Sequence, residues 1–266
     1  MTRVPITHQQ FLDRALPLLQ ADARILGVAV GGSWLRDAMD EYSDLDLVIA
    51  VDPAAYESVM RDRMAIAEGI GALLSGFTGE HVGEPRLIIN LYGPPVLHVD
   101  LKFVSLDDLP ERVEDPAILW ERDGAMTAAF ASKAPFYPQR DAQWMEDRFW
   151  VWIHYTAAHL GRGEIFETID ALTSIRGMVI GPLLAMKHGL RQRGMRQIEQ
   201  VAGDDLPDVI ATHPAYDAVS CGEATLALAR LYQRLRDELS PPDLIRRTDA
   251  EREALRYLQV EIGRLG

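Results

Sequence analysis

The residues of this chain whose types and spacing indicate chemistry lie within positions 31–49, in the run Gly-Gly-Ser-Trp-Leu-Arg-Asp-Ala-Met-Asp-Glu-Tyr-Ser-Asp-Leu-Asp-Leu-Val-Ile. Asp44 and Asp46 are separated by one residue, so on a strand both carboxylates project from the same face. Two negative charges at that separation repel each other unless a cation lies between them. Carboxylate oxygens favour Mg²⁺ over zinc or copper. The pair is therefore predicted to bind a divalent metal.

Gly32 and Ser33 follow an apolar run at positions 25–30, which predicts a strand, a tight turn and a helix that begins near Ser33. Free backbone N–H groups and the helix dipole suit a phosphate at such a point. Arg36, one helical turn later, is a further candidate contact for the phosphates. A surface salt bridge between Arg36 and Asp40 is the alternative.

Each part of this pattern also has an ordinary structural explanation. A Gly-Gly pair before a helix is most often only a turn, and Asp44 and Asp46 would serve as a helix cap and a solvated strand end. Asp46, however, lies within Leu-Asp-Leu-Val-Ile, which is apolar enough to be a central strand, where an unpaired charge is costly. The combination of the glycine turn and the paired acids favours a metal site.

Gly32-Ser33, ten intervening residues and Asp44-Leu45-Asp46 resemble the signature of the polymerase-beta-type nucleotidyltransferase superfamily. In that superfamily the Gly-Ser pair holds the triphosphate and the two Asp residues bind Mg²⁺. The motif Tyr-Ser-Asp-Leu-Asp-Leu and the chain length are similar to those of bacterial antibiotic nucleotidyltransferases that adenylylate aminoglycosides or lincosamides. The resemblance implies two Mg²⁺ ions and ATP, or another nucleoside triphosphate, as co-substrate.

A later strand, expected over residues 96–104, carries a third candidate acid. Leu97, Val99, Leu101 and Phe103 alternate there with His98, Asp100 and Lys102, so one face is core and the other carries an acid between two bases. Periodicity shows only which face Asp100 occupies. The superfamily resemblance implies that Asp100 approaches the same metal ions as Asp44 and Asp46 and accepts the proton of the attacking hydroxyl. The alternative is a solvent face with a mild ion pair.

Composition limits the kind of partner. The chain has 266 residues, a formal net charge of −13 and one cysteine, Cys221. An acidic chain has little general affinity for a polyanion, which disfavours nucleic acid, although Lys187, His188, Arg191, Arg193 and Arg196 cluster within ten residues. No apolar stretch is long enough to cross a bilayer and no signal region is apparent. With a single cysteine, these features predict a cytoplasmic location.

The pattern divides the chain into two expected domains, residues 1–138 and 139–266. The first is predicted to be a mixed sheet with helices over residues 9–21 and 53–74, strands over 25–30, 45–51, 86–91 and 96–104, a loop over 76–85 and a strandless connection over 105–134. The second is predicted to be a helical bundle, with helices over 143–160, 216–239 and 250–265 and one or two more over 164–193 that break at Gly177 or at Gly181-Pro182. The fold class is therefore α+β.

The function indicated is Mg²⁺-dependent transfer of a nucleoside monophosphate, AMP from ATP in the first instance, to a hydroxyl of a small acceptor. Aminoglycoside- and lincosamide-like antibiotics are candidate acceptors by resemblance. Acids of the second domain, Glu146, Glu164, Glu167 and Asp170, are candidates to bind a cationic acceptor. The alternatives are a non-catalytic regulatory or antitoxin-like binding protein on the same scaffold, and transfer to RNA or to a protein. The sequence leaves the oligomeric state open.

Overall fold

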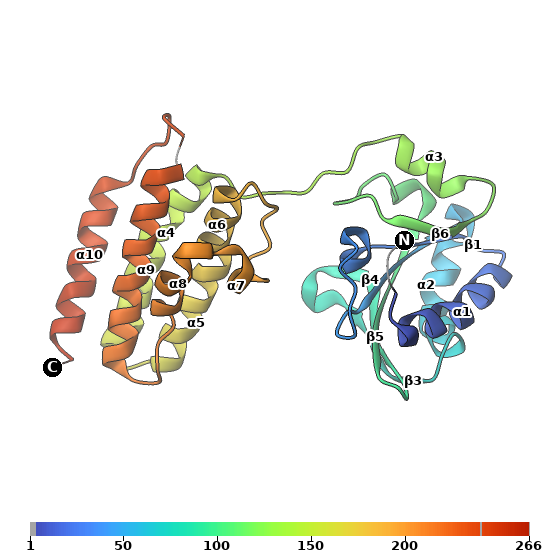
Figure 1. Ribbon diagram of the computed structural model, residues 1–266, viewed down its shortest axis with the longest axis horizontal. Coiled ribbons are helices and arrows are strands. Elements are labelled where there is room, and N and C mark those ends of the chain that lie inside the picture. Colours follow the sequence, from blue (N-terminus) through green and yellow to red (C-terminus); the bar gives the residue numbers. More distant parts are fainter. Residues whose placement is uncertain (1–3, 240, 266) are drawn as a thin grey trace. The chain divides into compact units, whose positions relative to one another are not determined.

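The computed structural model describes residues 4–239 and 241–265 (Figure 1). The chain divides into two compact units, Met1–Pro138 and Gln139–Gly266. The first unit contains a mixed sheet with helices, and the second is helical (Figure 1). The α+β fold class predicted from the sequence is confirmed by this arrangement.

The first unit is built on a six-stranded sheet with the strand order β3-β4-β5-β2-β1-β6. Its central strands β2 and β5 run parallel, and all other neighbouring strands are antiparallel. The strands are β1 (Ile25–Val30), β2 (Leu45–Val51), β3 (Leu73–Gly79), β4 (Glu84–Tyr92), β5 (Leu97–Ser105) and β6 (Ala117–Glu121).

Alternation along the central strands places a hydrophobic core on one face of the sheet. Leu45, Leu47 and Ile49 of β2 and Val99, Leu101 and Phe103 of β5 are all buried on this face. Helices α1 (Ile6–Ala21) and α2 (Tyr56–Gly69) cover it and lie together on one side of the sheet in Figure 1. The apolar side of this alternation therefore fixes which residues remain for the opposite face.

The opposite face is covered only in part. Ala50 of β2 and Val104 of β5 are buried there beside Met126 of α3 (Ala125–Ala131), and Val48 packs against the same cluster. Asp46 and Asp100, earlier on the same two strands, are half-buried. The cover therefore ends before the carboxylates.

Two strands were missed by the sequence pattern. The expected loop at residues 76–85 contains the second half of β3, in which glycine allows close packing: a Cβ on Gly76 would lie 2.8 Å from Oδ1 of Asn90. The expected strandless connection contains β6, which pairs with β1 at the sheet edge and has no fully buried residue. Helix α2 also ends at Gly69, earlier than predicted.

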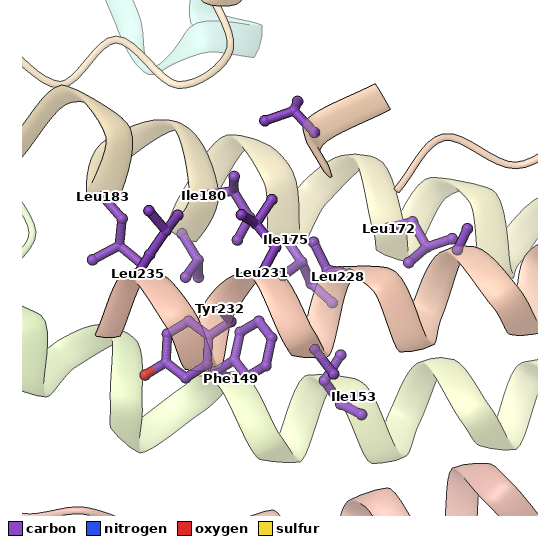
Figure 2. Close-up of a cluster of buried hydrophobic side chains, with 14 of the residues drawn as sticks. Phe149, Ile153, Leu172, Ile175, Ile180, Leu183, Leu228, Leu231, Tyr232 and Leu235 are labelled. Atoms are coloured by element: carbon purple, nitrogen blue, oxygen red, sulfur yellow. The ribbon is translucent and has the colours of Figure 1, made fainter. Parts of the chain in front are cut away.

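The second unit is a bundle of helices. They are α4 (Ala142–Gly161), α5 (Ile165–Ile175), α6 (Gly181–Lys187), α7 (Ile198–Val201), α8 (Leu206–Ala211), α9 (Ala218–Leu239) and α10 (Thr248–Gly263). A π-helical stretch, Arg176–Ile180, joins α5 to α6 without a break, so Gly177 and Gly181 do not end the helix as expected. Figure 2 shows the core between α4, α5–α6 and α9, where the rings of Phe149 and Tyr232 stack at 3.7 Å.

The continuous helix Ile165–Lys187 corrects one sequence-based expectation. By length and composition it is apolar enough to cross a membrane, whereas no such stretch was expected. Leu172, Val179 and Leu184 on this helix are buried in the core of the bundle, and 56% of its most apolar window is buried. The apolar character of the helix is thus explained by its packing.

A buried ionic network joins α4, α9 and α10. Glu146 is 1% exposed and accepts hydrogen bonds from the hydroxyl of Tyr232, from Arg236 at 3.4 Å and from the backbone N–H of Arg247 at 2.8 Å. Arg236 also contacts Glu251 at 2.7 Å. Glu146 therefore holds the bundle together and is not available to bind an acceptor, contrary to the expectation for it.

We expect Glu146→Ala to lower the free energy of unfolding by about 3–5 kcal/mol, because the buried side chains of Tyr232 and Arg236 and the backbone N–H of Arg247 lose their acceptor. Urea unfolding followed by tryptophan fluorescence measures this loss. The neighbouring Asp147, whose side chain is 36% exposed and pairs with Arg247, provides the control. Asp147→Ala should cost about 1 kcal/mol or less. Equal losses in the two variants would contradict the buried network.

Candidate functional site

The site is built on the register between β2 and β5. Asp46 is paired directly with Asp100 across the two parallel strands. Directly paired residues project from the same face of a sheet, so the two carboxyl groups lie side by side on the face opposite the main core. The side chain of Asp100 is 22% exposed. The structure thus brings together two of the three predicted acids by backbone pairing.

Asp44 completes the group from the residues just before β2. It is half-buried, and its charge acts on Asp100. Burial raises the pKa of the Asp100 carboxyl above its ordinary value; a hydrogen bond from His98 opposes that rise, and the negative charge of Asp44 adds to it. Burial and the neighbouring charge of Asp44 therefore disfavour the ionised form of Asp100.

The two bases that flank Asp100 on β5 have different roles. His98 contacts Oδ1 of Asp100 through Nε2 at 2.9 Å, so it belongs to the site. Lys102 forms an ion pair with Glu84 at 2.7 Å, and Glu84 also accepts a hydrogen bond from Arg86. The charge of Lys102 is therefore paired with a carboxylate of the neighbouring strand.

The glycine corner lies directly against Asp46. The backbone N–H of Gly31 donates to the carbonyl of Asp46 at 2.9 Å, and Gly32 has a φ of +64°. A Cβ on Gly32 would lie 1.9 Å from Oδ2 of Asp46, so only glycine fits there. The expected helix is a short 3₁₀ segment, Gly32–Arg36, which ends with Asp37 in the left-handed conformation.

Ser33 and Arg36 lie on this segment as predicted. The Oγ atom of Ser33 is buried without a hydrogen-bond partner in the described structure, which is unusual for a polar atom and would be relieved by a ligand that accepts a hydrogen bond. Arg36 is exposed. Among the described residues, Asp40 accepts from the N–H of Tyr42 and from Ser43, and Arg36 forms no pair with it. The alternative salt bridge is therefore wrong.

One residue at the corner was not anticipated. Glu114, in the segment before β6, accepts a hydrogen bond from the N–H of Gly32 at 3.4 Å. Its carboxylate occupies the position at which the sequence predicts an anionic phosphate. The only sequence signal was an acid in a segment interpreted as a connection, which carries no spatial information.

The donor set fits magnesium that is shared with a phosphate ligand. Among residues 4–239 and 241–265, no group of three or more His, Cys, Asp or Glu side chains is arranged to hold a metal ion by itself. Mg²⁺ is commonly held by one or two carboxylates together with substrate phosphates and water, so a complete protein cage is not required. The oxygen chemistry of Asp44, Asp46 and Asp100 and the unpaired Oγ of Ser33 suit that arrangement.

The remaining predicted acids are in the second unit. Glu164 contacts Nδ1 of His159, whereas Glu167 and Asp170 line a pocket of about 270 Å³ with Trp152. A larger pocket of about 410 Å³ lies between α1 and the turn from β4 to β5. Neither pocket is lined by Asp44, Asp46 or Asp100, so the carboxylate site lies outside these two cavities.

We expect Gly32→Ala to displace the Asp46 carboxylate and to weaken binding of Mg²⁺ and ATP, because its Cβ overlaps Oδ2 of Asp46. Isothermal titration of ATP with Mg²⁺ measures the effect. Gly83→Ala is the control, since Gly83 has a φ of +76° but no atom within 4 Å of an added Cβ. Both variants carry the same kind of backbone strain, so equal binding losses would contradict the role of the corner.

Asp100→Asn is expected to raise the melting temperature of the metal-free protein at pH 7. Because the folded-state pKa of Asp100 is raised, its protonated form stabilises the fold, and that contribution is lost as the pH rises through the folded-state pKa. Asparagine removes this cost at neutral pH, and the gain should vanish below the ordinary pKa of 3.8. Thermal melts in EDTA test this expectation. They should run from about pH 3, below the ordinary pKa of an aspartate, to about pH 7. A lower melting temperature at pH 7 would contradict it.

Comparison with known proteins finds similar solved structures, three of which are described below. No family model and no curated protein matches the chain. An aminoglycoside 6-adenyltransferase from Bacillus subtilis has 16% identity and a TM-score of 0.42 over 95% of this chain and 97% of that one. A nucleotidyltransferase-like protein from Exiguobacterium sibiricum 255-15 has 14% identity and a TM-score of 0.39, over 97% and 89%. A spectinomycin adenyltransferase from Enterococcus faecialis, solved with ATP and spectinomycin, has 11% identity and a TM-score of 0.31, over 96% and 99%.

Proposed function

We propose that this chain is a Mg²⁺-dependent nucleotidyltransferase that moves a nucleoside monophosphate, AMP from ATP in the first instance, to a hydroxyl of a small acceptor. The observation that supports it is the pairing of Asp46 with Asp100 beside the Gly32–Ser33 corner, with Asp44 acting on the same group. Paired acids next to a buried hydroxyl without a hydrogen-bond partner suit a metal-bound triphosphate better than a purely structural role.

The chain's own groups would bind and orient the nucleotide. The N–H of Gly32 and the Oγ of Ser33 donate to the phosphates at the corner, and the Glu114 carboxylate moves away from Gly32 to admit them. Arg36, which is exposed on the same 3₁₀ segment, adds a positive charge near the phosphates. Asp44, Asp46 and Asp100 would hold the magnesium, which supplies neutralisation of the triphosphate charge when it is bound.

The transfer itself needs a base at the acceptor oxygen. Asp100 accepts the hydroxyl proton as that oxygen forms its bond to the α-phosphorus. The bond between the α-phosphorus and the bridging oxygen breaks, and pyrophosphate leaves on the opposite side. His98 holds one oxygen of Asp100 and so orients the other toward the acceptor.

The second unit is proposed to contribute to acceptor binding. Its pocket contains an indole ring and two carboxylates, from Trp152, Glu167 and Asp170. An aromatic wall with two acids suits an amine-bearing molecule, which agrees with an antibiotic of the aminoglycoside or lincosamide kind as one candidate. Cytoplasmic location also remains a prediction.

We expect Asp46→Asn and Asp100→Asn each to reduce acceptor-dependent pyrophosphate release by at least about a hundredfold, since loss of a direct metal ligand costs more than loss of its supporting contacts. A screen of hydroxyl-bearing acceptors with Mg²⁺ and ATP supplies the assay. Asp37→Asn is the control, because Asp37 is exposed on the same loop and asparagine tolerates its left-handed backbone.

Near-normal turnover in either variant would contradict the metal assignment. Binding of Mg²⁺ and ATP without turnover on any acceptor would instead favour the non-catalytic binding protein. Labelling of RNA or of a protein from radiolabelled ATP in a lysate would favour a macromolecular acceptor.

A further inference from the structure

The carboxylate pair belongs to a row that crosses four strands of the sheet. Asp46 on β2 is paired with Asp100 on β5, Asp100 with Ile89 on β4, and Ile89 with Phe77 on β3. Directly paired residues share a face, so the row passes from two acids to two apolar side chains. At the usual spacing between strands, Phe77 lies roughly 10 Å from Asp100 along the row.

The apolar end of this row is open. Phe77 is 52% exposed, and Leu91, two residues after Ile89 on the same face, is 39% exposed. Within the described ranges, neither residue nor Ile89 belongs to a buried cluster or packs against one. Helices α1 and α2, which cover the sheet, pack against the residues of its other face. We call Phe77, Ile89 and Leu91 the apolar shelf.

The position of the shelf relative to the glycine corner determines what would lie on it. The corner follows β1, and β1 neighbours β2 on the side away from β5. Pyrophosphate would therefore leave toward β1, because the corner holds the terminal phosphates. The attacking oxygen enters in line with the leaving oxygen and from the opposite side. That side is β5, and an acceptor whose hydroxyl reaches Asp100 has its body over β4 and β3.

The charges beside the shelf are already paired. Lys102 and Arg86 are both bound to Glu84, and together they hold the pKa of Glu84 at about 2. His98, next to the shelf, is bound to Asp100. The shelf itself offers carbon surface to a ligand, and the ring of His81 lies beside that of Phe77, with 5.6 Å between the ring centroids.

We propose that the apolar shelf is the acceptor-binding surface of the first unit, and that the acceptor carries its hydroxyl on a body with an apolar ring or alkyl face. This inference rests on the proposed function. It narrows the acceptor to molecules that combine a hydroxyl with hydrocarbon surface, as opposed to those that are polar on every side.

The test uses binding of two probes to the full chain without nucleotide, so it does not depend on transfer. Phenyl β-D-glucopyranoside has hydroxyls and an aromatic face, and methyl β-D-glucopyranoside has the hydroxyls alone. Saturation-transfer NMR titrations should show binding of the phenyl probe only. Phe77→Ser should weaken it by about tenfold, as expected for losing the burial of one ring face.

Phe136→Ser is the matched control, because Phe136 is a 71% exposed phenylalanine in the same unit, and it should leave probe binding unchanged. Equal binding of the two probes, or equal loss in both variants, would overturn the proposal. A change of molecular mass in Phe77→Ser by light scattering would overturn it in favour of a second copy of the chain.

If Phe77→Ser loses the phenyl probe while no acceptor supports pyrophosphate release, the shelf stands and the proposed transfer fails. If transfer occurs and the phenyl probe binds independently of Phe77, the function stands and the shelf fails. The two proposals are therefore separable.

Discussion

The parallel pairing of β2 with β5 is the constraint on which the site depends. Its register places Asp46 opposite Asp100 and, on the other face, Leu47 opposite Leu101. A slip of one residue would turn every side chain of one strand to the wrong face, moving acids into the core and leucines into solvent. The buried leucines therefore fix the position of the acids, and the hydrophobic core is what keeps the like charges together.

Holding these acids together costs stability, and two features of the site carry that cost. Burial and the charge of Asp44 raise the pKa of Asp100, and Gly32 is held in a left-handed conformation against Asp46. The buried acid Glu146, in contrast, has three hydrogen-bond donors around it. An acid with a raised pKa and a glycine in a left-handed conformation lie beside each other here, which is typical of sites organised for a ligand.

The sequence contained enough information to predict the central elements of this site. The strand predicted over 25–30 matches β1. The alternation of apolar and polar residues over 96–104 predicted the correct face of Asp100, because the apolar residues of that pattern are the ones buried in β5. The neighbour of that strand could not be derived from periodicity, since pairing is set by contacts distant in sequence. Strand β3 was hidden by glycines that pack closely against β4, and Glu114 by a segment without a pattern.

The same face of the sheet explains why the site lies at one end of its strands. Beyond Asp46, β2 presents Val48 and Ala50 on this face, and both contact the cluster around Met126 of α3. Beyond Asp100, β5 presents Lys102, which is tied to Glu84, and then the buried Val104. On each strand, the residues two to four positions after the acid are thus buried or packed on this face. The cover formed by α3 therefore ends where the carboxylates begin.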